Sequence, residues 1–286
     1  MCDQDQLNAM GSAAVSRRQF AALGAMATLA ACTTMESQAV GGLAESMVSF
    51  PAHNGTMDAF FVHPAAGKHP AVIIWPDIAG LRDAFKAMGR RLAASGYSVL
   101  VVNPFYQDAP APQFADFEAF RSGGGFQKVG PWMAKNTYET VISTAQAVVT
   151  WLDQQAAVDT SRGIGTQGYC MGGPFVIRTA AAVPARIKAG ATFHGAGLVA
   201  DEATAPYKLL PQTRASYLIA IAKNDDAQNP THKDLFKQAA AAAGRPAEVE
   251  VYGGDHGWTV PDSPVYNEAE AERAWARLLA LYNSAL

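Results

Sequence analysis

The hexapeptide Gly168-Tyr169-Cys170-Met171-Gly172-Gly173 is the sequence feature that most restricts the fold. It stands between a short apolar run, 163–165, and a run typical of a helix, 174–178. Glycines two residues before and after a central residue allow a turn too sharp for a Cβ at those positions. The segment therefore predicts a strand, turn and helix that together form a nucleophile elbow presenting Cys170. The alternative is a glycine-rich loop around a buried, unreactive thiol.

The composition limits the fold class and the kinds of partner. The chain has 286 residues, of which 49% are hydrophobic, and its formal net charge is −3. This length and apolar content suit one large α/β domain. Lysine and arginine are dispersed and not in excess, so we expect no nucleic-acid partner. We also expect no metal and no cofactor, because His, Cys and acidic residues do not cluster at ligand spacing. The oligomeric state is left open.

The first 31 residues have the pattern of an export signal rather than of a folded segment. Ser16-Arg17-Arg18-Gln19-Phe20 is a twin-arginine pattern, and the apolar run 21–30 follows it. That run is too short for a stable membrane span, and a twin-arginine signal is an address read by a receptor. Leu29-Ala30-Ala31-Cys32 resembles a bacterial lipobox, whose cysteine is lipidated; the alternative is ordinary cleavage nearby. We therefore predict a periplasmic or exported protein, with Cys32 as the candidate for a lipid anchor to the membrane.

Cleavage before Cys32 would leave a small, polar segment, 32–46, as a flexible tether to a folded domain at 47–286. Cys2 would be removed and Cys32 at most lipidated. Cys170 would then have no partner for an intramolecular disulfide. A thiol outside a disulfide is a liability in an oxidising compartment unless it is sheltered or needed, which favours a functional role for Cys170.

Hydrophobic patterning along the chain alternates between strands and helices. The segments 47–50 and 57–62 flank Asn54-Gly55 and predict a β-hairpin. Buried strands are predicted at 71–75, 98–102, 187–193, 217–222 and 247–252, and helices at 85–94, 137–155, 231–243 and 266–282. The stretch 103–136 is irregular, as expected for a lid or binding loop. This order predicts one doubly wound α/β domain with a mostly parallel sheet and helices on both faces.

Candidate catalytic residues follow three of these strands, where the reactive groups of such sheets lie. Cys170 comes first, an acid follows a later strand, and His256 follows the last strand, in a tight loop. His256 is the predicted general base toward Cys170. His194 also ends a strand and is the second choice. Asp225 and Asp226 compete for the acid, with Asp225 preferred; the alternative is that both cap the following helix.

Four segments together resemble the dienelactone hydrolase family of α/β-hydrolases, from about Val48 to the C-terminus. They are the elbow, Trp75-Pro76-Asp77-Ile78-Ala79-Gly80, Asn224-Asp225 and His256-Gly257. The resemblance implies an α/β-hydrolase fold and a triad made by the cysteine of the elbow, Asp225 and His256.

The same resemblance implies an oxyanion hole made by the backbone N–H groups of Met171 and Ile78. In the family, a glutamate after the early strand contacts the resting thiol. Asp77 holds that position here, and its shorter side chain is expected to reach the thiol over a longer distance or through water. A plain helix N-cap is the alternative for Asp77.

Two departures from the family bear on the substrate. Members that cleave dienelactones hold a substrate carboxylate with two arginines, and neither has a counterpart in Gln107-Asp108 or in Trp258-Thr259-Val260-Pro261. Tyr106 and Trp258 instead suggest a more aromatic substrate pocket. We therefore expect a metal-free, carboxymethylenebutenolidase-like hydrolase of small carboxylic esters or lactones that forms an acyl-enzyme. The alternatives are a short-chain esterase or thioesterase, and a non-catalytic binding protein with this fold.

Overall fold

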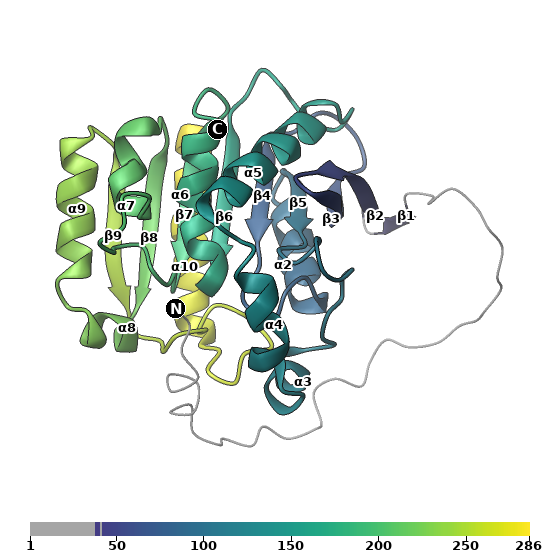
Figure 1. Cartoon of the computed structure of the whole chain (residues 1–286). Coiled ribbons are helices and arrows are strands. Elements are labelled where there is room, and N and C mark those ends of the chain that lie inside the picture. The colour runs from purple at the N-terminus through teal and green to yellow at the C-terminus, as the bar shows by residue number, and fades with distance from the viewer. Residues whose placement is uncertain (1–37, 41) are drawn as a thin grey trace.

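The computed structural model describes residues 38–40 and 42–286, which form one nine-stranded sheet with helices on both faces (Figure 1). The strands are β1 (Gln38–Val40), β2 (Leu43–Ala52), β3 (Gly55–Pro64), β4 (Ala71–Trp75), β5 (Ser98–Val102), β6 (Ile164–Tyr169), β7 (Ile187–Phe193), β8 (Ser216–Ala222) and β9 (Ala247–Tyr252). From one edge to the other, the strand order is β1-β2-β3-β5-β4-β6-β7-β8-β9. The predicted single α/β domain with a mostly parallel sheet is confirmed.

The sheet changes from antiparallel to parallel along this order. β1, β2, β3 and β5 pair antiparallel, and β2 and β3 form the predicted hairpin, with Asn54 at φ +56° in its turn. From β5 through β4 to β9 every pairing is parallel. Parallel strands place their carboxyl ends at one edge, so the loops after β4, β6, β7, β8 and β9 all emerge on the same side.

Helices cover the two faces of the sheet in separate groups (Figure 1). The helices are α2 (Asp83–Ala94), α3 (Phe117–Ser122), α4 (Gly125–Met133), α5 (Tyr138–Asp153), α6 (Gly173–Ala182), α7 (Pro206–Leu209), α8 (Lys223–Gln228), α9 (His232–Ala242) and α10 (Glu268–Ala285). α2 and α10 bury Phe85 and Leu278 in one core cluster. α5, α6 and α9 bury Leu152, Val176 and Phe236 in the other cluster, on the opposite face. Apolar side chains on one side of each helix thus meet a sheet that is apolar on both faces.

Two expectations about local structure were wrong. The stretch 103–136 is not irregular throughout, because α3 and α4 form in it and bury Phe117, Phe120 and Val129 against the core. Gly124, at φ +66°, turns the chain between these two helices. The tether also ends earlier than residue 46, since β2 starts at Leu43 and pairs with β3 along its whole length.

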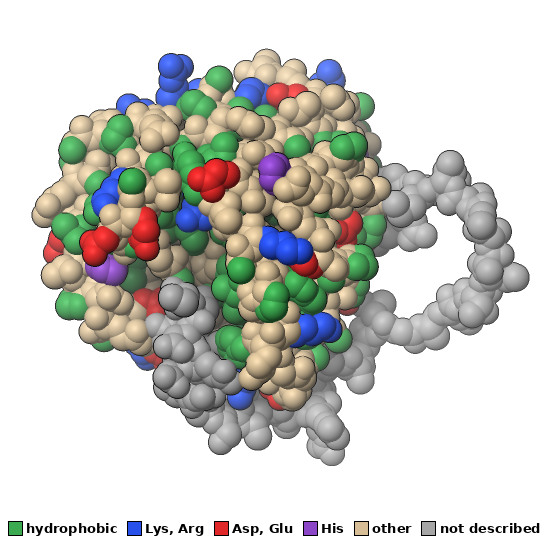
Figure 2. Space-filling model, viewed as in Figure 1, with side chains coloured by type: hydrophobic (Ala, Val, Ile, Leu, Met, Phe, Trp, Pro, Cys, Tyr) green, Lys and Arg blue, Asp and Glu red, His purple; other side chains and the backbone are tan. Residues whose placement is uncertain are grey.

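The predicted export signal, Cys32 and much of the tether lie outside the described residues. Among the helices that are described, none is long and apolar enough to cross a bilayer. On the face shown in Figure 2, acidic and basic side chains are interspersed rather than gathered by sign.

Candidate active site

The elbow predicted around Cys170 has the backbone that its glycines permit. β6 ends at Tyr169, a single 3₁₀ turn spans Cys170–Gly172, and α6 begins at the next residue. Cys170 has φ +50°, a left-handed conformation that is uncommon for a residue with a side chain. Its side chain is buried, at 5% exposure. Strain of this kind persists only where the surrounding structure imposes it, and it concentrates at functional sites.

Close backbone contacts around the elbow require its glycines. A methyl group on Gly172 would overlap the carbonyl oxygen of Trp75 and lie 2.6 Å from that of Pro76. A methyl group on Gly173 would overlap the backbone of Gly195. The elbow is therefore wedged between the loops that follow β4 and β7, and no side chain fits at these two positions.

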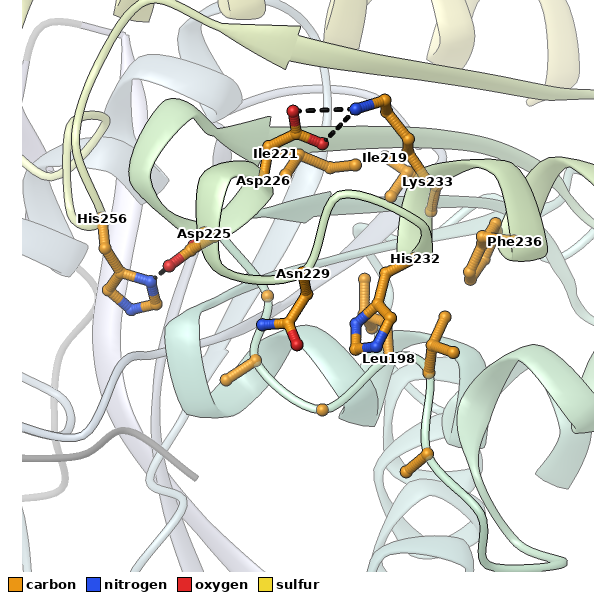
Figure 3. A pocket seen from close by; sticks show the side chains of 15 residues that line it. Leu198, Ile219, Ile221, Asp225, Asp226, Asn229, His232, Lys233, Phe236 and His256 are labelled. Atoms are coloured by element: carbon orange, nitrogen blue, oxygen red, sulfur yellow. Dashed lines mark hydrogen bonds and ion pairs between the residues drawn. The ribbon is translucent and has the colours of Figure 1, made fainter. Parts of the chain in front are cut away.

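His256 lies in the loop after β9 and is held by two residues that follow β8 (Figure 3). Its ring Nδ1 is 2.7 Å from Oδ2 of Asp225. Its backbone N–H donates to Oδ1 of Asn224, at 2.8 Å. A carboxylate on Nδ1 orients an imidazole and stabilises its protonated form, which prepares Nε2 for proton transfer.

Of the two competing acids, Asp225 is thus the one that meets the imidazole. Asp226 points away and accepts two hydrogen bonds from Nζ of Lys233, at 2.7 and 2.8 Å. Both aspartates lie in α8, a helix that the sequence patterns did not predict. Successive residues of a helix differ by about 100° in direction, so adjacent side chains face different neighbours.

His194, the second-choice base, lies between the elbow and His256. Its ring centroid is 4.9 Å from that of His256 and 6.1 Å from that of Tyr169. Its Nε2 lies 3.0 Å from the hydroxyl oxygen of Thr259. Burial, reinforced by the neighbouring His256, holds the pKa of His194 well below its ordinary value. We infer that His194 is a neutral packing partner of His256.

Asp77 is engaged by a residue that the sequence patterns did not single out. Its two carboxylate oxygens accept hydrogen bonds from Arg82 at 2.7 and 2.9 Å, and Oδ1 also accepts from the N–H of Ala79 at 2.9 Å. The N-cap alternative for Asp77 is wrong, because the N-cap of α2 is Arg82. The expected contact between Asp77 and the thiol stays a prediction.

Arg82 joins two loops of the active-site edge. Its guanidinium also donates to both oxygens of Asp262, at 2.7 and 2.8 Å, and to the carbonyl of Gly80 at 3.2 Å. Burial alone would lower the pKa of Arg82, but the carboxylates of Asp77 and Asp262 outweigh it and raise that pKa. The loop after β4 is thereby fastened to the loop that carries His256. The sequence signal that could have predicted this contact is an arginine in the otherwise apolar stretch before α2.

Met171 and Ile78, the expected sources of the oxyanion hole, occupy loops in direct contact. Met171 is in the 3₁₀ turn of the elbow, and Ile78 follows β4 in the loop against which Gly172 packs. Both side chains are buried, at 7% and 2% exposure. Their N–H groups as oxyanion donors remain a prediction, supported by this packing.

Of the two expected aromatic substrate contacts, Tyr106 stays a prediction and Trp258 lies in the core. The Tyr106 hydroxyl donates to the carbonyl of His53 at 2.6 Å and lies 2.9 Å from the hydroxyl of Thr144, so its tip is committed to the β2–β3 hairpin and α5. Trp258 is fully buried and stacks on Tyr252 with ring centroids 4.8 Å apart. The Trp258 ring therefore has no exposed surface with which to line a substrate pocket.

A cavity of about 320 Å³ opens beside His256 (Figure 3). β8 forms its floor, and the loop after β7, α8 and α9 form its walls. Asp225 and His256 form one end of it, whereas Cys170 is not among the lining residues. The cavity therefore borders the imidazole rather than covering the thiol. In the part of the chain that is described, no three His, Cys, Asp or Glu side chains are grouped to hold a metal ion.

These features can be compared with known proteins. Residues 57–286 match the model of the dienelactone hydrolase family. The "Putative carboxymethylenebutenolidase" of Salmonella typhi is 27% identical over 246 residues, which cover 84% of this chain and 87% of the relative. A protein with the same description from Methylorubrum extorquens is 27% identical over 260 residues, covering 89% of this chain and 85% of the relative.

Solved structures show the same fold. The "Putative Dienelactone Hydrolase" from Klebsiella pneumoniae has a TM-score of 0.71 and 22% identity, and the match covers 84% of this chain and 98% of that one. Taken with the family model, which spans most of the sequence, the chain belongs to the dienelactone hydrolase family.

Proposed function

We propose that this hydrolase cleaves small carboxylic esters or lactones through a triad of Cys170, His256 and Asp225, with an acyl-enzyme intermediate. The observation that carries the proposal is the 2.7 Å contact between His256 Nδ1 and Asp225. It orients the imidazole at the same sheet edge as a cysteine held at φ +50°. An oriented base and a strained, glycine-flanked nucleophile at one sheet edge supply the groups that acyl transfer requires.

The first half of the proposed reaction transfers the acyl group to sulfur. His256 takes the thiol proton, and the sulfur of Cys170 forms a bond to the substrate carbonyl carbon. The carbonyl oxygen becomes an oxyanion, stabilised by the N–H groups of Met171 and Ile78. Collapse of this intermediate breaks the bond to the alcohol oxygen. That oxygen takes the proton from His256. The alcohol of an ester then leaves, whereas the new hydroxyl of an opened lactone stays attached to the acyl group.

The second half returns the enzyme to its starting state. His256 removes a proton from water, and the resulting hydroxide adds to the thioester carbonyl. The carbon–sulfur bond breaks, the thiolate of Cys170 regains the proton from His256, and the acid is released. Asp225 stays ionised throughout and stabilises the imidazolium that forms in each half.

Turnover of a p-nitrophenyl ester of a short acid tests this function. Cys170→Ala is expected to lower kcat/KM at least roughly a thousandfold. Asp225→Asn is expected to lower it by roughly 10²- to 10⁴-fold, since the imidazole loses its orienting charge. Asp234→Asn is the matched control, because Asp234 lies nearby in α9 and its side chain is 61% exposed. Undiminished, correctly folded Cys170→Ala enzyme would refute the proposal.

We also propose that the chain is exported through its twin-arginine segment and anchored by lipid on Cys32. The supporting observation is the lipobox-like sequence that ends at Cys32. Metabolic labelling with a radioactive fatty acid should mark the wild-type chain and not Cys32→Ala. Label on both chains, or on neither, would contradict the anchoring proposal.

A further inference from the structure

The cavity beside His256 has an apolar floor and a polar rim (Figure 3). Ile219 and Ile221 of β8, Leu198 of the loop after β7 and Phe236 of α9 supply apolar surface. At about 320 Å³ it lies at the small end of the range typical of ligand pockets. A short acyl chain or a single ring is the size of group that such a volume holds.

The lysine on its lining is paired with an acid. Besides Asp225, which is bonded to His256, the cavity is bordered by Asp226 and Lys233. Lys233 donates to both oxygens of Asp226, and the two side chains are only 28% and 20% exposed. A substrate carboxylate would find no unpaired cation among these residues. To bind Lys233, the substrate carboxylate would have to displace Asp226 from a bidentate, partly buried contact.

We propose that this cavity binds an uncharged, largely apolar part of the substrate, and that the Asp226–Lys233 pair selects against esters and lactones that carry a carboxylate. The inference rests on the proposed function, because His256 is both the proposed base and one wall of the cavity. A bound group there lies beside the imidazole that would serve the reaction. Asp226 is then a specificity-determining residue: it neutralises a lysine that would otherwise attract anions.

The first experiment changes the charge of the cavity without changing its shape. The two substrates are p-nitrophenyl butyrate, which is neutral, and mono-p-nitrophenyl succinate, which carries a carboxylate. Asp226→Asn unmasks Lys233, so we expect the ratio of kcat/KM for succinate to kcat/KM for butyrate to rise roughly five- to tenfold. Added salt should reduce that gain, since the new attraction is between partly exposed charges. Asp234→Asn, in the same helix as Lys233 and outside the cavity, should leave the ratio unchanged.

The second experiment changes the volume of the cavity. His232 and Leu235 both lie in α9, but only His232 lines the cavity, whereas Leu235 is 40% exposed. His232→Trp is expected to lower kcat/KM for p-nitrophenyl hexanoate several-fold more than for the acetate, because the longer chain needs the space. Leu235→Trp should affect the two esters equally.

The outcomes separate this inference from the function on which it rests. Hydrolysis that does not depend on Cys170 would refute both. Hydrolysis that depends on Cys170, with a succinate-to-butyrate ratio unmoved by Asp226→Asn, would overturn the inference alone. A wild-type enzyme that prefers the succinate ester would also overturn it.

Discussion

Replacement of Arg82 by Met is expected to destabilise the protein strongly. Arg82 is fully buried and balances Asp77, whose side chain is 5% exposed, and Asp262, at 22%. The variant keeps most of the apolar stem and leaves both carboxylates without their cation. Breaking a buried pair by removing one partner typically costs about 3–5 kcal/mol. For a chain of this size, that corresponds to a fall in Tm of roughly 6–20 °C.

Urea denaturation followed by tryptophan fluorescence measures this effect. Arg91→Met is the matched control: Arg91 lies in α2, the helix that follows Arg82, and makes a bidentate pair with Glu272, but the two side chains are 45% and 49% exposed. We expect that control to lose less than about 1 kcal/mol. The two substitutions are the same, and both remove bidentate arginine–carboxylate contacts, so the contrast compares a buried arginine that joins two acids with an exposed arginine that pairs with one.

A double variant tests the physical cause. If the cost arises from an unbalanced buried carboxylate, Arg82→Met combined with Asp77→Asn should be more stable than Arg82→Met alone, by at least about 1 kcal/mol. The reasoning is refuted if Arg82→Met unfolds within about 1 kcal/mol of the wild type. It is refuted equally if neutralising Asp77 lowers the stability of the Arg82→Met protein further.

Two further variants probe the active-site edge. The pKa of His194 is depressed in the folded state. Below the unfolded value of about 6.5, the unfolded chain therefore binds a proton at this residue that the native chain does not bind. This difference lowers the stability on acidification by up to about 1.4 kcal/mol per pH unit. Denaturation at pH 7.5, 6 and 5 should therefore show a smaller acid loss for His194→Gln, and an equal loss would contradict the assignment. Gly172→Ala should cost more than about 3 kcal/mol or abolish soluble expression, because two backbone carbonyls occupy the space of the methyl group. Gly130→Ala, in α4 with no atom within 4 Å of the new methyl, should be neutral or stabilising by up to about 1 kcal/mol.

Local sequence determined the sheet with high fidelity. Continuous apolar runs bounded by turn residues predicted β4 and β5 to the residue, because a strand buried on both faces has no charged position to interrupt it. β7 and β9 were also predicted to the residue, although Lys188 interrupts the first and Glu248 and Glu250 alternate with apolar residues in the second. The hairpin followed from Asn54-Gly55, and the elbow from glycines whose missing side chains leave room for backbone contacts. Each of these signals spans only a few consecutive residues, so it can be recognised in a single sequence.

Packing decided what the patterns left open or missed. The helices α3 and α4 formed where turn residues predicted a loop, since buried phenylalanines outweighed the glycine tract. Trp258 was expected at a pocket and lies in the core, because its loop folds back over Tyr252. Packing contacts of this kind cannot be inferred from the order of residues along the chain.

The candidate site, too, was predictable in part from the sequence and decided in part by packing. The order of Cys170, an acid and His256 along the chain is visible in the sequence, because each follows a strand whose end is easy to recognise. Which aspartate meets the imidazole depends on the direction of one turn of α8. That Arg82 fastens Asp77 to Asp262 depends on two loops, 180 residues apart, meeting at one sheet edge. Orientation and long-range contact arise only when the strands are placed side by side, and for that reason the tertiary structure alone decided them.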